Sequence, residues 1–309
     1  GSKVIFAKGL FNNIYIRFMS LQTTGTIFMV RNNAFNFNQQ TAGSNSFQHA
    51  GKADTKEVLA EFDAAVLKIN DAGIDVTVFE NNNIETPDAI FPNNWIAVTN
   101  KHVILFPMMA ANRRNERNEM IINHYLKNGR QLLNFTHYES KNLFLEGTGS
   151  IVFDHEEKLA FCAISERSNI KVLNDVCQQL SYKAISFETT FHNQPVYHTN
   201  VLMSIGNGLA IVCKEIVLPN YHRLIEDALE NTTKVIINSG QMQNFAGNVI
   251  ALIAKNEPCW VMSENAFKSL NKSQLKTFEK SGLLIVVDVG TIEFYGGGGI
   301  RCMIAEVFL

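Results

Sequence analysis

The last part of the chain places a cysteine just after a run of glycines, in "GGGGIRCM". Residues 296–299 form a loop almost free of side chains, and Arg301 and Cys302 lead from it into a short apolar stretch. A free cysteine is usually a small buried hydrophobic residue. Beside a glycine loop at the mouth of a strand, however, its sulfur can meet a ligand, because backbone and ligand approach each other closely there. We therefore take Cys302 as a candidate nucleophile.

A histidine and a glutamate that lie far from Cys302 in the chain complete a set suited to thiol chemistry. They are His198 in "YHTN" and Glu146 in "LEGTGS". Taken singly, each has an ordinary interpretation, as a strand-end histidine and a solvated glutamate, and His192 in "FHNQ" competes with His198. Together, a thiol, an imidazole and a carboxylate are the parts of a covalent catalyst. A nearby imidazolium also increases the thiolate fraction of a cysteine.

A repeated pattern predicts how these residues are brought together. Segments that begin at Asn93, Thr148, His198 and Gly247 each contain two short apolar strands joined by a polar turn. Their equivalent positions, followed at the same interval by Cys302, are Asn94, Ser150, Asn200 and Asn248. A period of about fifty residues indicates a repeat architecture.

Helical patterns separate the predicted hairpins, and a further strand follows each helix. The expected helices are residues 55–73, 113–129, 168–182, 220–231 and 263–282; the strands after them include residues 75–79, 183–187, 234–239 and 283–289. In the second helix, Met120, Ile121, His124 and Tyr125 share one face, and Ser168 is the expected cap of the third.

The fifth unit is split between the two ends of the chain. Its last strand lies in residues 302–309 and its partner in residues 26–32, so pairing them closes a ring. We expect an α/β fold, a five-fold pseudosymmetric α/β-propeller of ββαβ-type units closed by N- and C-terminal strands. The alternative is an open α/β sheet. In the ring, the hairpin starts converge on the axis and bring Asn93, Asn94, Glu146, His198 and Cys302 around one pocket.

Composition limits the class of protein. The 309 residues are 46% apolar and 18% charged with a net charge of −2, as in a soluble globular protein, and give no general attraction for nucleic acid or a membrane. The five cysteines contain no CxxC pair, which favours reduced thiols and a cytoplasmic location. The sequence shows no metal, flavin, nucleotide or pyridoxal motif, so we expect no cofactor, and it leaves the oligomeric state open.

The N-terminal region differs from the rest. Gly1 and Ser2 look like an expression-vector remnant, and residues 3–18 are basic with no acidic residue. That composition is compatible with a targeting peptide or with an arm added upstream of a natural start at Met19. We predict an N-terminal arm over residues 1–24 and a single catalytic domain over residues 25–309.

The motifs "EGTG", "YHTN" and "GGGGIRCM", in this order and at the repeat spacing, resemble those of the penteins, the guanidino-group-modifying enzymes. The resemblance covers residues 25–309. It is closest to the amidinotransferase-related, citrulline-utilization branch through "PDAIFPNNW" and "FPMMAANRRNE". It implies a cysteine-dependent hydrolase whose partner is an amino-acid substrate.

The resemblance also implies roles for individual residues. Cys302 is the nucleophile, His198 the general acid and base, and Glu146 the carboxylate that holds the histidine. Asp88 holds the α-amino group of the substrate, and Arg114 and Arg167 bind its carboxylate by paired hydrogen bonds. Asp88 could instead form a turn after Pro87, and Arg113 and Arg114 could lie on the solvated face at the start of a charged helix. The choice of Arg114 over Arg113 rests on the resemblance alone.

The sequence departs from the guanidine-binding pattern by placing amides where those enzymes have acids. The substituted positions include Asn93, Asn94 and Asn200. An amide both donates and accepts, which suits a neutral ureido group, whereas a carboxylate only accepts. We therefore expect citrulline as substrate, with ornithine, carbon dioxide and ammonia as products. The alternatives are an arginine deiminase or dihydrolase, an amidinotransferase, and a non-catalytic pentein that binds another protein.

Overall fold

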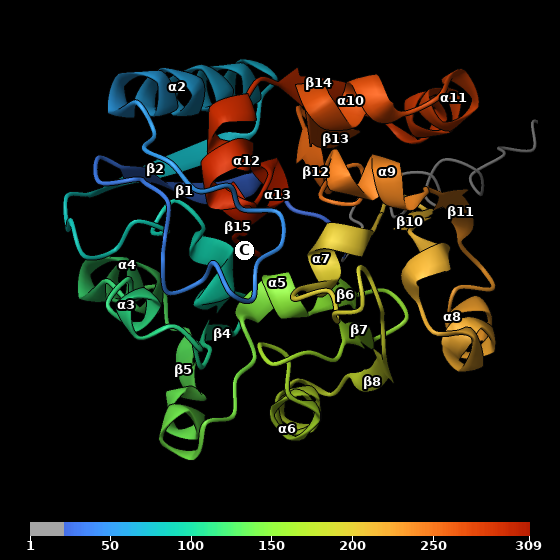
Figure 1. The fold of residues 1–309 in the computed structure, drawn as a ribbon, viewed down its shortest axis with the longest axis horizontal. Coiled ribbons are helices and arrows are strands. Elements are labelled where there is room, and N and C mark those ends of the chain that lie inside the picture. Colours follow the sequence, from blue (N-terminus) through green and yellow to red (C-terminus); the bar gives the residue numbers. More distant parts are fainter. Residues whose placement is uncertain (1–21) are drawn as a thin grey trace, which may run out of the picture.

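The computed structural model describes residues 22–309, which form five separate three-stranded sheets and the helices around them (Figure 1). The sheet orders are β15-β1-β2, β3-β4-β5, β6-β7-β8, β9-β10-β11 and β12-β13-β14. In each sheet the first strand pairs with the middle one antiparallel, and the middle strand pairs with the last one parallel.

The strands are short. They are β1 (Thr26–Asn32), β2 (Asp75–Asn81), β3 (Ile96–Val98), β4 (His102–Leu105), β5 (Gln131–Asn134), β6 (Val152–Asp154), β7 (Leu159–Ala163), β8 (Lys183–Phe187), β9 (Met203–Gly206), β10 (Leu209–Val212), β11 (Thr233–Ile236), β12 (Ile250–Ala254), β13 (Glu257–Ser263), β14 (Leu283–Val287) and β15 (Ala305–Glu306).

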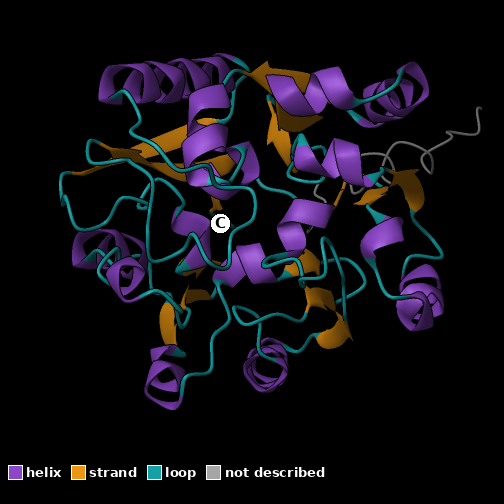
Figure 2. Cartoon of the chain, viewed as in Figure 1, coloured by secondary structure: helices purple, strands orange, loops and turns teal. Residues whose placement is uncertain are grey.

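A parallel pair needs a crossover, and a helix supplies it in every unit. These crossover helices are α2 (Thr55–Asp71), α4 (Glu119–Leu126), α6 (Ile170–Leu180), α8 (His222–Ala228), α10 (Glu264–Ser269) and α11 (Lys272–Ser281). Figure 2 shows them at the outside of the molecule, with the strands nearer its middle. The predicted repeat of strand, strand, helix and strand is confirmed.

The two ends of the described chain meet in one sheet. β1 pairs antiparallel with β15, with Ile27 opposite Glu306, and pairs parallel with β2, with Thr26 opposite Asp75. Residues 26–32 and the end of the chain therefore form the split unit that the sequence predicts. The five sheets are not joined into one continuous sheet in the described part of the chain.

Three local predictions are wrong. The helix expected over residues 263–282 is two helices, α10 and α11, because Leu270 is extended and the Asn271 side chain caps the start of α11. The helix expected over residues 113–129 is two helices, α3 (Ala111–Arg114) and α4, because the Asn118 side chain accepts a hydrogen bond from the Met120 backbone and starts a new helix. Met120 is consequently 60% exposed, while Ile121 is buried. The cap of α6 is Asn169, because the Ser168 hydroxyl is directed inward to Ser150.

Residues 22–24, the last part of the predicted arm, are buried against the body. The Gln22 amide donates to the carbonyl groups of Phe153 and Ile205, which lie on two neighbouring inner strands. The remainder of the arm, with Gly1, Ser2 and Met19, lies outside the described residues. Within residues 22–309, no helix has the length and apolar character needed to span a bilayer.

Candidate active site

Short helical turns precede the first strand of four of the sheets and bring the predicted residues together. They are η1 (Pro92–Asn94), α5 (Gly147–Ser150), α7 (Thr199–Leu202) and α13 (Ile300–Met303). α5 packs against both η1 and α7, and α13 packs against η1. Asn94, Glu146, His198 and Cys302 lie on or beside these turns, at the same end of their sheets.

The Cys302 thiol is buried and held by two amides. Its Sγ accepts hydrogen bonds from Nδ2 of Asn200 and Nδ2 of Asn248, each at 3.3 Å. Burial raises the pKa of Cys302, and the two amide hydrogen bonds act against this increase. The resting sulfur is therefore a protonated thiol at neutral pH and needs a base to become a nucleophile.

Neighbouring atoms pack so closely against the loop before α13 that only glycine fits there. Gly297 has φ of 63°, and a Cβ there would lie 2.6 Å from Nδ2 of Asn45. A Cβ on Gly299 would lie 2.9 Å from Oδ1 of Asn248. A larger residue at position 299 would displace Asn248, which holds the thiol, and one at position 297 would displace Asn45, which binds the loop at Gly296.

His198 and Glu146 form a buried pair. Nε2 of His198 lies 2.8 Å from Oε2 of Glu146, and the other carboxylate oxygen accepts from the Met109 backbone. Burial lowers the pKa of His198 to about 4, although the Glu146 hydrogen bond raises it. The imidazole is therefore neutral at pH 7, with its proton on Nε2 toward the carboxylate and a lone pair on Nδ1.

Glu146 is ionised because two arginines and the hydrogen bond from His198 outweigh the effect of its burial. Burial alone raises its pKa, but Arg167, His198 and Arg113 together lower it to about 2. Arg167 lies 3.6 Å from the carboxylate, while its Nε donates to the Ser44 hydroxyl at 2.9 Å. An ionised Glu146 can stabilise an imidazolium on His198 when that ring accepts a proton.

A small cavity of about 20 Å³ lies between these groups. Five predicted site residues line it: Asp88, Asn94, Arg167, His198 and Cys302. Glu146 does not line the cavity but hydrogen-bonds to His198, which does. Asn93 and Asn200 do not line the cavity. Asn200 instead donates to the Cys302 thiol on the cavity wall, and Asn93 accepts from the Asn94 amide at 3.1 Å.

Arg113, and not Arg114, lines the cavity. Nη1 of Arg113 donates to Oδ1 of Asn94 at 2.6 Å, and its Nε donates to Glu116 at 2.8 Å. Arg114 is directed away: it donates to the carbonyl groups of Met108 and Met109. In the four-residue helix α3, neighbouring side chains point in different directions, so only one of the two reaches the site.

His192, the competing histidine, lies in an exposed turn with φ of 50°, whereas His198 is buried.

Two contacts were missed by sequence reasoning. Asn248 holds the thiol, and its repeat position, equivalent to Asn200, was the available signal. The Tyr197 hydroxyl donates to the Gly297 carbonyl at 2.6 Å, and no pattern in the sequence indicated it.

Asp88 offers an unused acceptor to the cavity. Its Oδ2 accepts from Asn38 at 2.7 Å and from Thr41 at 3.2 Å, whereas Oδ1 is buried without a hydrogen-bond partner in the described part of the chain. Burial raises the pKa of Asp88, against the attraction of Arg113. A cationic group of a substrate would satisfy the free oxygen and favour the ionised form.

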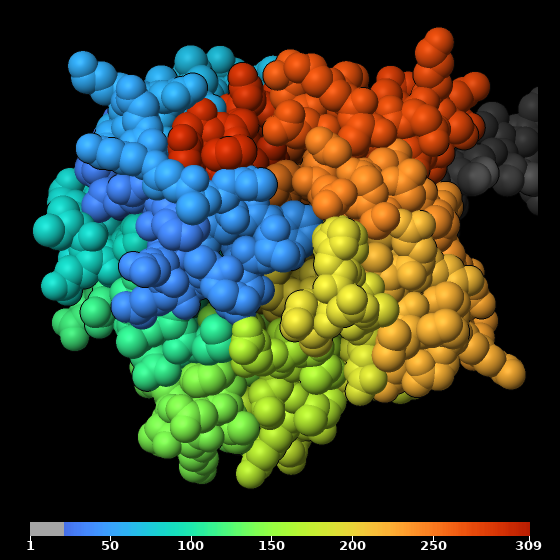
Figure 3. All heavy atoms as spheres, in the orientation of Figure 1, coloured from blue at the N-terminus to red at the C-terminus, as the bar shows by residue number. Residues whose placement is uncertain are grey.

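The segment from residue 33 to residue 54 covers this end of the molecule (Figure 3). It carries Asn38, Thr41 and Ser44, which bind Asp88 and Arg167, and Asn45, whose amide donates to the Gly296 carbonyl. A cavity of about 20 Å³ holds little more than one water molecule, so this arrangement leaves no room for an amino acid beside Cys302.

Comparison with known proteins places the chain in a family. The model of "N,N dimethylarginine dimethylhydrolase, eukaryotic" matches residues 31–309. The chain belongs to this family. It is therefore a member of the pentein superfamily of guanidino-modifying hydrolytic enzymes. A search of curated protein sequences finds no match.

Solved structures share the pentein fold of this family member. The substrate-bound N-terminal domain of ArgZ, a cyanobacterial arginine dihydrolase, is 15% identical with a TM-score of 0.76, over 92% of this chain and 98% of that one. AgrE with L-arginine is 15% identical with a TM-score of 0.75, over 91% and 40%. DDAH from Pseudomonas aeruginosa with citrulline is 15% identical with a TM-score of 0.68, over 92% and 99%. At this identity the similarity establishes the fold.

Proposed function

We propose that this protein is a cysteine-dependent hydrolase that cleaves the C–N bonds of the ureido or guanidino group of an amino acid, with citrulline as substrate. The observation that carries the proposal is that His198, hydrogen-bonded to the buried Glu146, lines the same small cavity as the Cys302 thiol. The set corresponds to a base, its orienting carboxylate and a nucleophile, each supplied by a different repeat unit.

In the proposed reaction, Nδ1 of neutral His198 takes the thiol proton as Cys302 attacks the ureido carbon. The imidazolium, stabilised by Glu146, then donates that proton to the departing ammonia, leaving a thiocarbamate on the sulfur. Water, deprotonated by His198, attacks the thiocarbamate and restores the thiol. The released carbamate decomposes to ornithine and carbon dioxide. Citrulline and one water thus yield ornithine, carbon dioxide and ammonia.

Charged groups at the cavity suit the other end of an amino acid. The free Oδ1 of Asp88 is a partner for an α-amino group, and the guanidinium groups of Arg113 and Arg167 are partners for a carboxylate. This assignment replaces Arg114 by Arg113. Both arginines already bind protein groups, so substrate must share or displace those hydrogen bonds.

The surroundings of the thiol favour a neutral reacting group. Sγ of Cys302 is hydrogen-bonded to the amides of Asn200 and Asn248, and Oδ1 of Asn200 is a buried acceptor without a partner among residues 22–309. A ureido NH would satisfy that oxygen. Asn94 on the cavity wall supplies a further amide, although its oxygen is already bound to Arg113.

A second candidate is hydrolysis of a cationic guanidino acid, either arginine or dimethylarginine. The raised pKa of the buried Cys302 favours it, because a guanidinium beside the sulfur would stabilise the thiolate. The family description, the arginine dihydrolase ArgZ and the complex of AgrE with L-arginine support the same class. Arginine hydrolysed twice would yield two ammonia molecules for each ornithine.

The test is to supply purified protein with citrulline, arginine and dimethylarginine separately and to measure ammonia, ornithine, citrulline and dimethylamine. The proposal predicts equal ornithine and ammonia from citrulline. Arginine that stops at citrulline would identify a deiminase, and dimethylamine release would identify a dimethylarginine hydrolase. Amidino transfer to added glycine in place of hydrolysis would identify an amidinotransferase.

We also propose that the five units form one closed ring in a single catalytic domain over residues 25–309. Support comes from the first strands of all five sheets, β15, β3, β6, β9 and β12, which line a common central cavity. The contacts between β15 and β3, β6 and β9, and β9 and β12 connect neighbouring units.

A further inference from the structure

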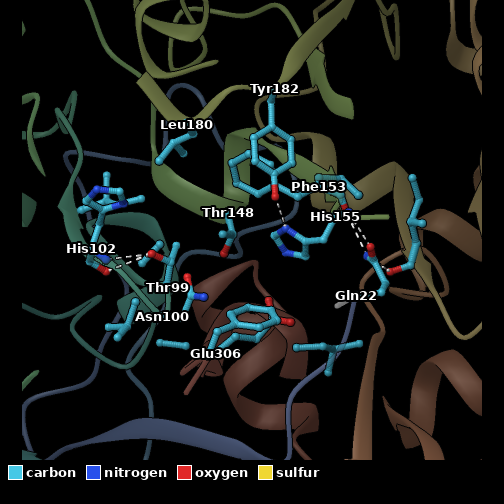
Figure 4. A pocket seen from close by; sticks show the side chains of 18 of the residues that line it. Gln22, Thr99, Asn100, His102, Thr148, Phe153, His155, Leu180, Tyr182 and Glu306 are labelled. Carbon is cyan, nitrogen blue, oxygen red and sulfur yellow. Dashed lines mark hydrogen bonds between the residues drawn. The ribbon is translucent and has the colours of Figure 1, made fainter. Parts of the chain in front are cut away.

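A second cavity lies among the first strands of the five sheets, beyond the end that carries the thiol (Figure 4). Its volume is about 370 Å³, within the range of small-molecule sites, and it shares no lining residue with the cavity at Cys302. The two cavities meet α13 from different sides: Arg301 lines the larger one, and the next residue, Cys302, lines the smaller one.

One wall of this cavity is aromatic. The rings of Phe153 and His155 are stacked, with their centroids 5.4 Å apart. Tyr182 packs edge-on against Phe153, and Phe308 packs edge-on against His155. Nδ1 of His155 lies 2.6 Å from the Tyr182 hydroxyl, which fixes both rings (Figure 4). Burial lowers the pKa of His155 to about 4, so the wall is uncharged at neutral pH. Such a wall suits a planar apolar body.

The charged groups around the cavity are mostly cationic. Lys101, Lys158 and Arg301 line it, against the single carboxylate of Glu306, which is the only acid on its wall within residues 22–309. Nη2 of Arg301 already binds Glu306 at 3.0 Å, so the positive charge that no carboxylate of residues 22–309 neutralises belongs to the two exposed lysines at the hairpin turns. Nζ of Lys158 lies 4.9 Å from the centre of the Tyr182 ring and donates to its hydroxyl at 3.4 Å, so this charge lies beside the aromatic wall. A ligand that extends from the wall to this mouth would place an anionic group there.

A buried polar atom inside the cavity has no partner. The Oγ of Ser204, on β9, is buried and makes no hydrogen bond to any of residues 22–309, yet the residue is part of the wall. A hydroxyl left without a partner at such a depth costs free energy, and a ligand with a polar atom on its body would recover it.

From these features we propose that the central cavity is a second small-molecule site, which binds a planar aromatic anion with its ring against Phe153 and Tyr182, a polar atom at Ser204 and its charge toward Lys101 and Lys158. The site is separate from the thiol chemistry, and its test does not depend on catalysis.

The experiment is a fluorescence titration of the full chain with 8-anilinonaphthalene-1-sulfonate, an aromatic sulfonate, compared with N-phenyl-1-naphthylamine, which has the same rings without the charge. We expect saturable binding of one sulfonate per chain, about tenfold tighter than binding of the neutral probe. Non-saturable binding, or equal affinity for both probes, would overturn the proposal.

Variants locate the bound probe. Lys101→Glu combined with Lys158→Glu should weaken sulfonate binding by about tenfold and leave the neutral probe unaffected. The control, Lys56→Glu with Lys276→Glu, makes the same change of net charge on exposed positions of α2 and α11, and should have no effect. Equal weakening by both pairs would contradict a local site.

A third variant fills the cavity. Ala97→Phe, on β3, adds a ring to the wall and should abolish saturable binding of both probes, with circular dichroism and thermal melting to check the fold. Unchanged binding in a folded Ala97→Phe protein would contradict the proposal, and the lysine pair decides the question if this variant does not fold.

Discussion

Replacing Asn200 by aspartate puts a negative charge beside the nucleophile. The amide of Asn200 lies 3.3 Å from Sγ of Cys302, and a carboxylate oxygen at that distance repels a thiolate by about 5 kcal/mol at an effective dielectric constant of ~20. That energy raises the pKa of Cys302 by roughly three to four. Since neutral citrulline offers no compensating charge, its kcat/KM should decrease by about three orders of magnitude.

A guanidinium substrate would respond differently to Asn200→Asp. Its positive charge neutralises the new carboxylate, and a charged hydrogen bond contributes about 1.5–3 kcal/mol. The ratio of kcat/KM for arginine to kcat/KM for citrulline should therefore rise by about 10- to 150-fold. Ammonia release measures both values, and the pH dependence of iodoacetamide alkylation measures the thiol pKa.

Asn248→Asp is the matched control for Asn200→Asp. Asn248 donates to the same sulfur at the same distance of 3.3 Å, so it should raise the thiol pKa similarly. Its Nδ2 also binds the Asn200 carbonyl, which places it on the side away from the substrate in our proposal. The substrate ratio should change much less than in Asn200→Asp. An equal change in both variants, or no change in either, would refute the assignment of Asn200 to the reacting group.

The remaining predictions concern single residues. His198→Ala should lower kcat by at least ~100-fold while His192→Ala leaves it unchanged, and the opposite order in steady-state assays would contradict the assignment. Arg113→Ala should decrease the free energy of unfolding by about 3–5 kcal/mol in urea titrations, because it leaves the buried charge of Glu116 unpaired. Arg114→Ala should decrease the free energy of unfolding by less than about 1 kcal/mol. Similar losses in the two variants would be inconsistent with the contacts described. Burial raises the pKa of Glu293 to about 7, so the stability that is present below the unfolded pKa of 4.5 is lost as pH rises through 7. Glu293→Gln should therefore stabilise the protein by about 3 kcal/mol at pH 8 and little at pH 5. An equal effect at both pH values would argue against this pKa.

The repeat architecture could be predicted because every unit shows the same local sequence pattern. Alternating apolar runs, polar turns and helical faces recur about every fifty residues, and the split unit follows from one unpaired strand at each end. The same spacing places Cys302 at the point of its unit that Asn200 occupies, two residues after His198, so the convergence of the thiol and the imidazole needs no knowledge of side-chain packing.

What the sequence did not determine depends on packing between units. Arg113 and Arg114 are adjacent and chemically identical, and only the orientation of the short helix α3 directs one of them into the cavity. The break before α4 depends on an asparagine cap that competes with a continuous helical pattern. The central cavity is formed by strands from five units, and no single segment indicates its volume or its charge.

The central claim is a covalent intermediate on Cys302. It is tested most directly by mixing the protein with citrulline, and in parallel with arginine, quenching in acid and mapping peptides by mass spectrometry. We predict an adduct equal in mass to the substrate less ammonia on the peptide that contains Cys302. The adduct should be absent from a folded Cys302→Ser variant that has also lost turnover. Turnover retained in Cys302→Ser would contradict the covalent mechanism.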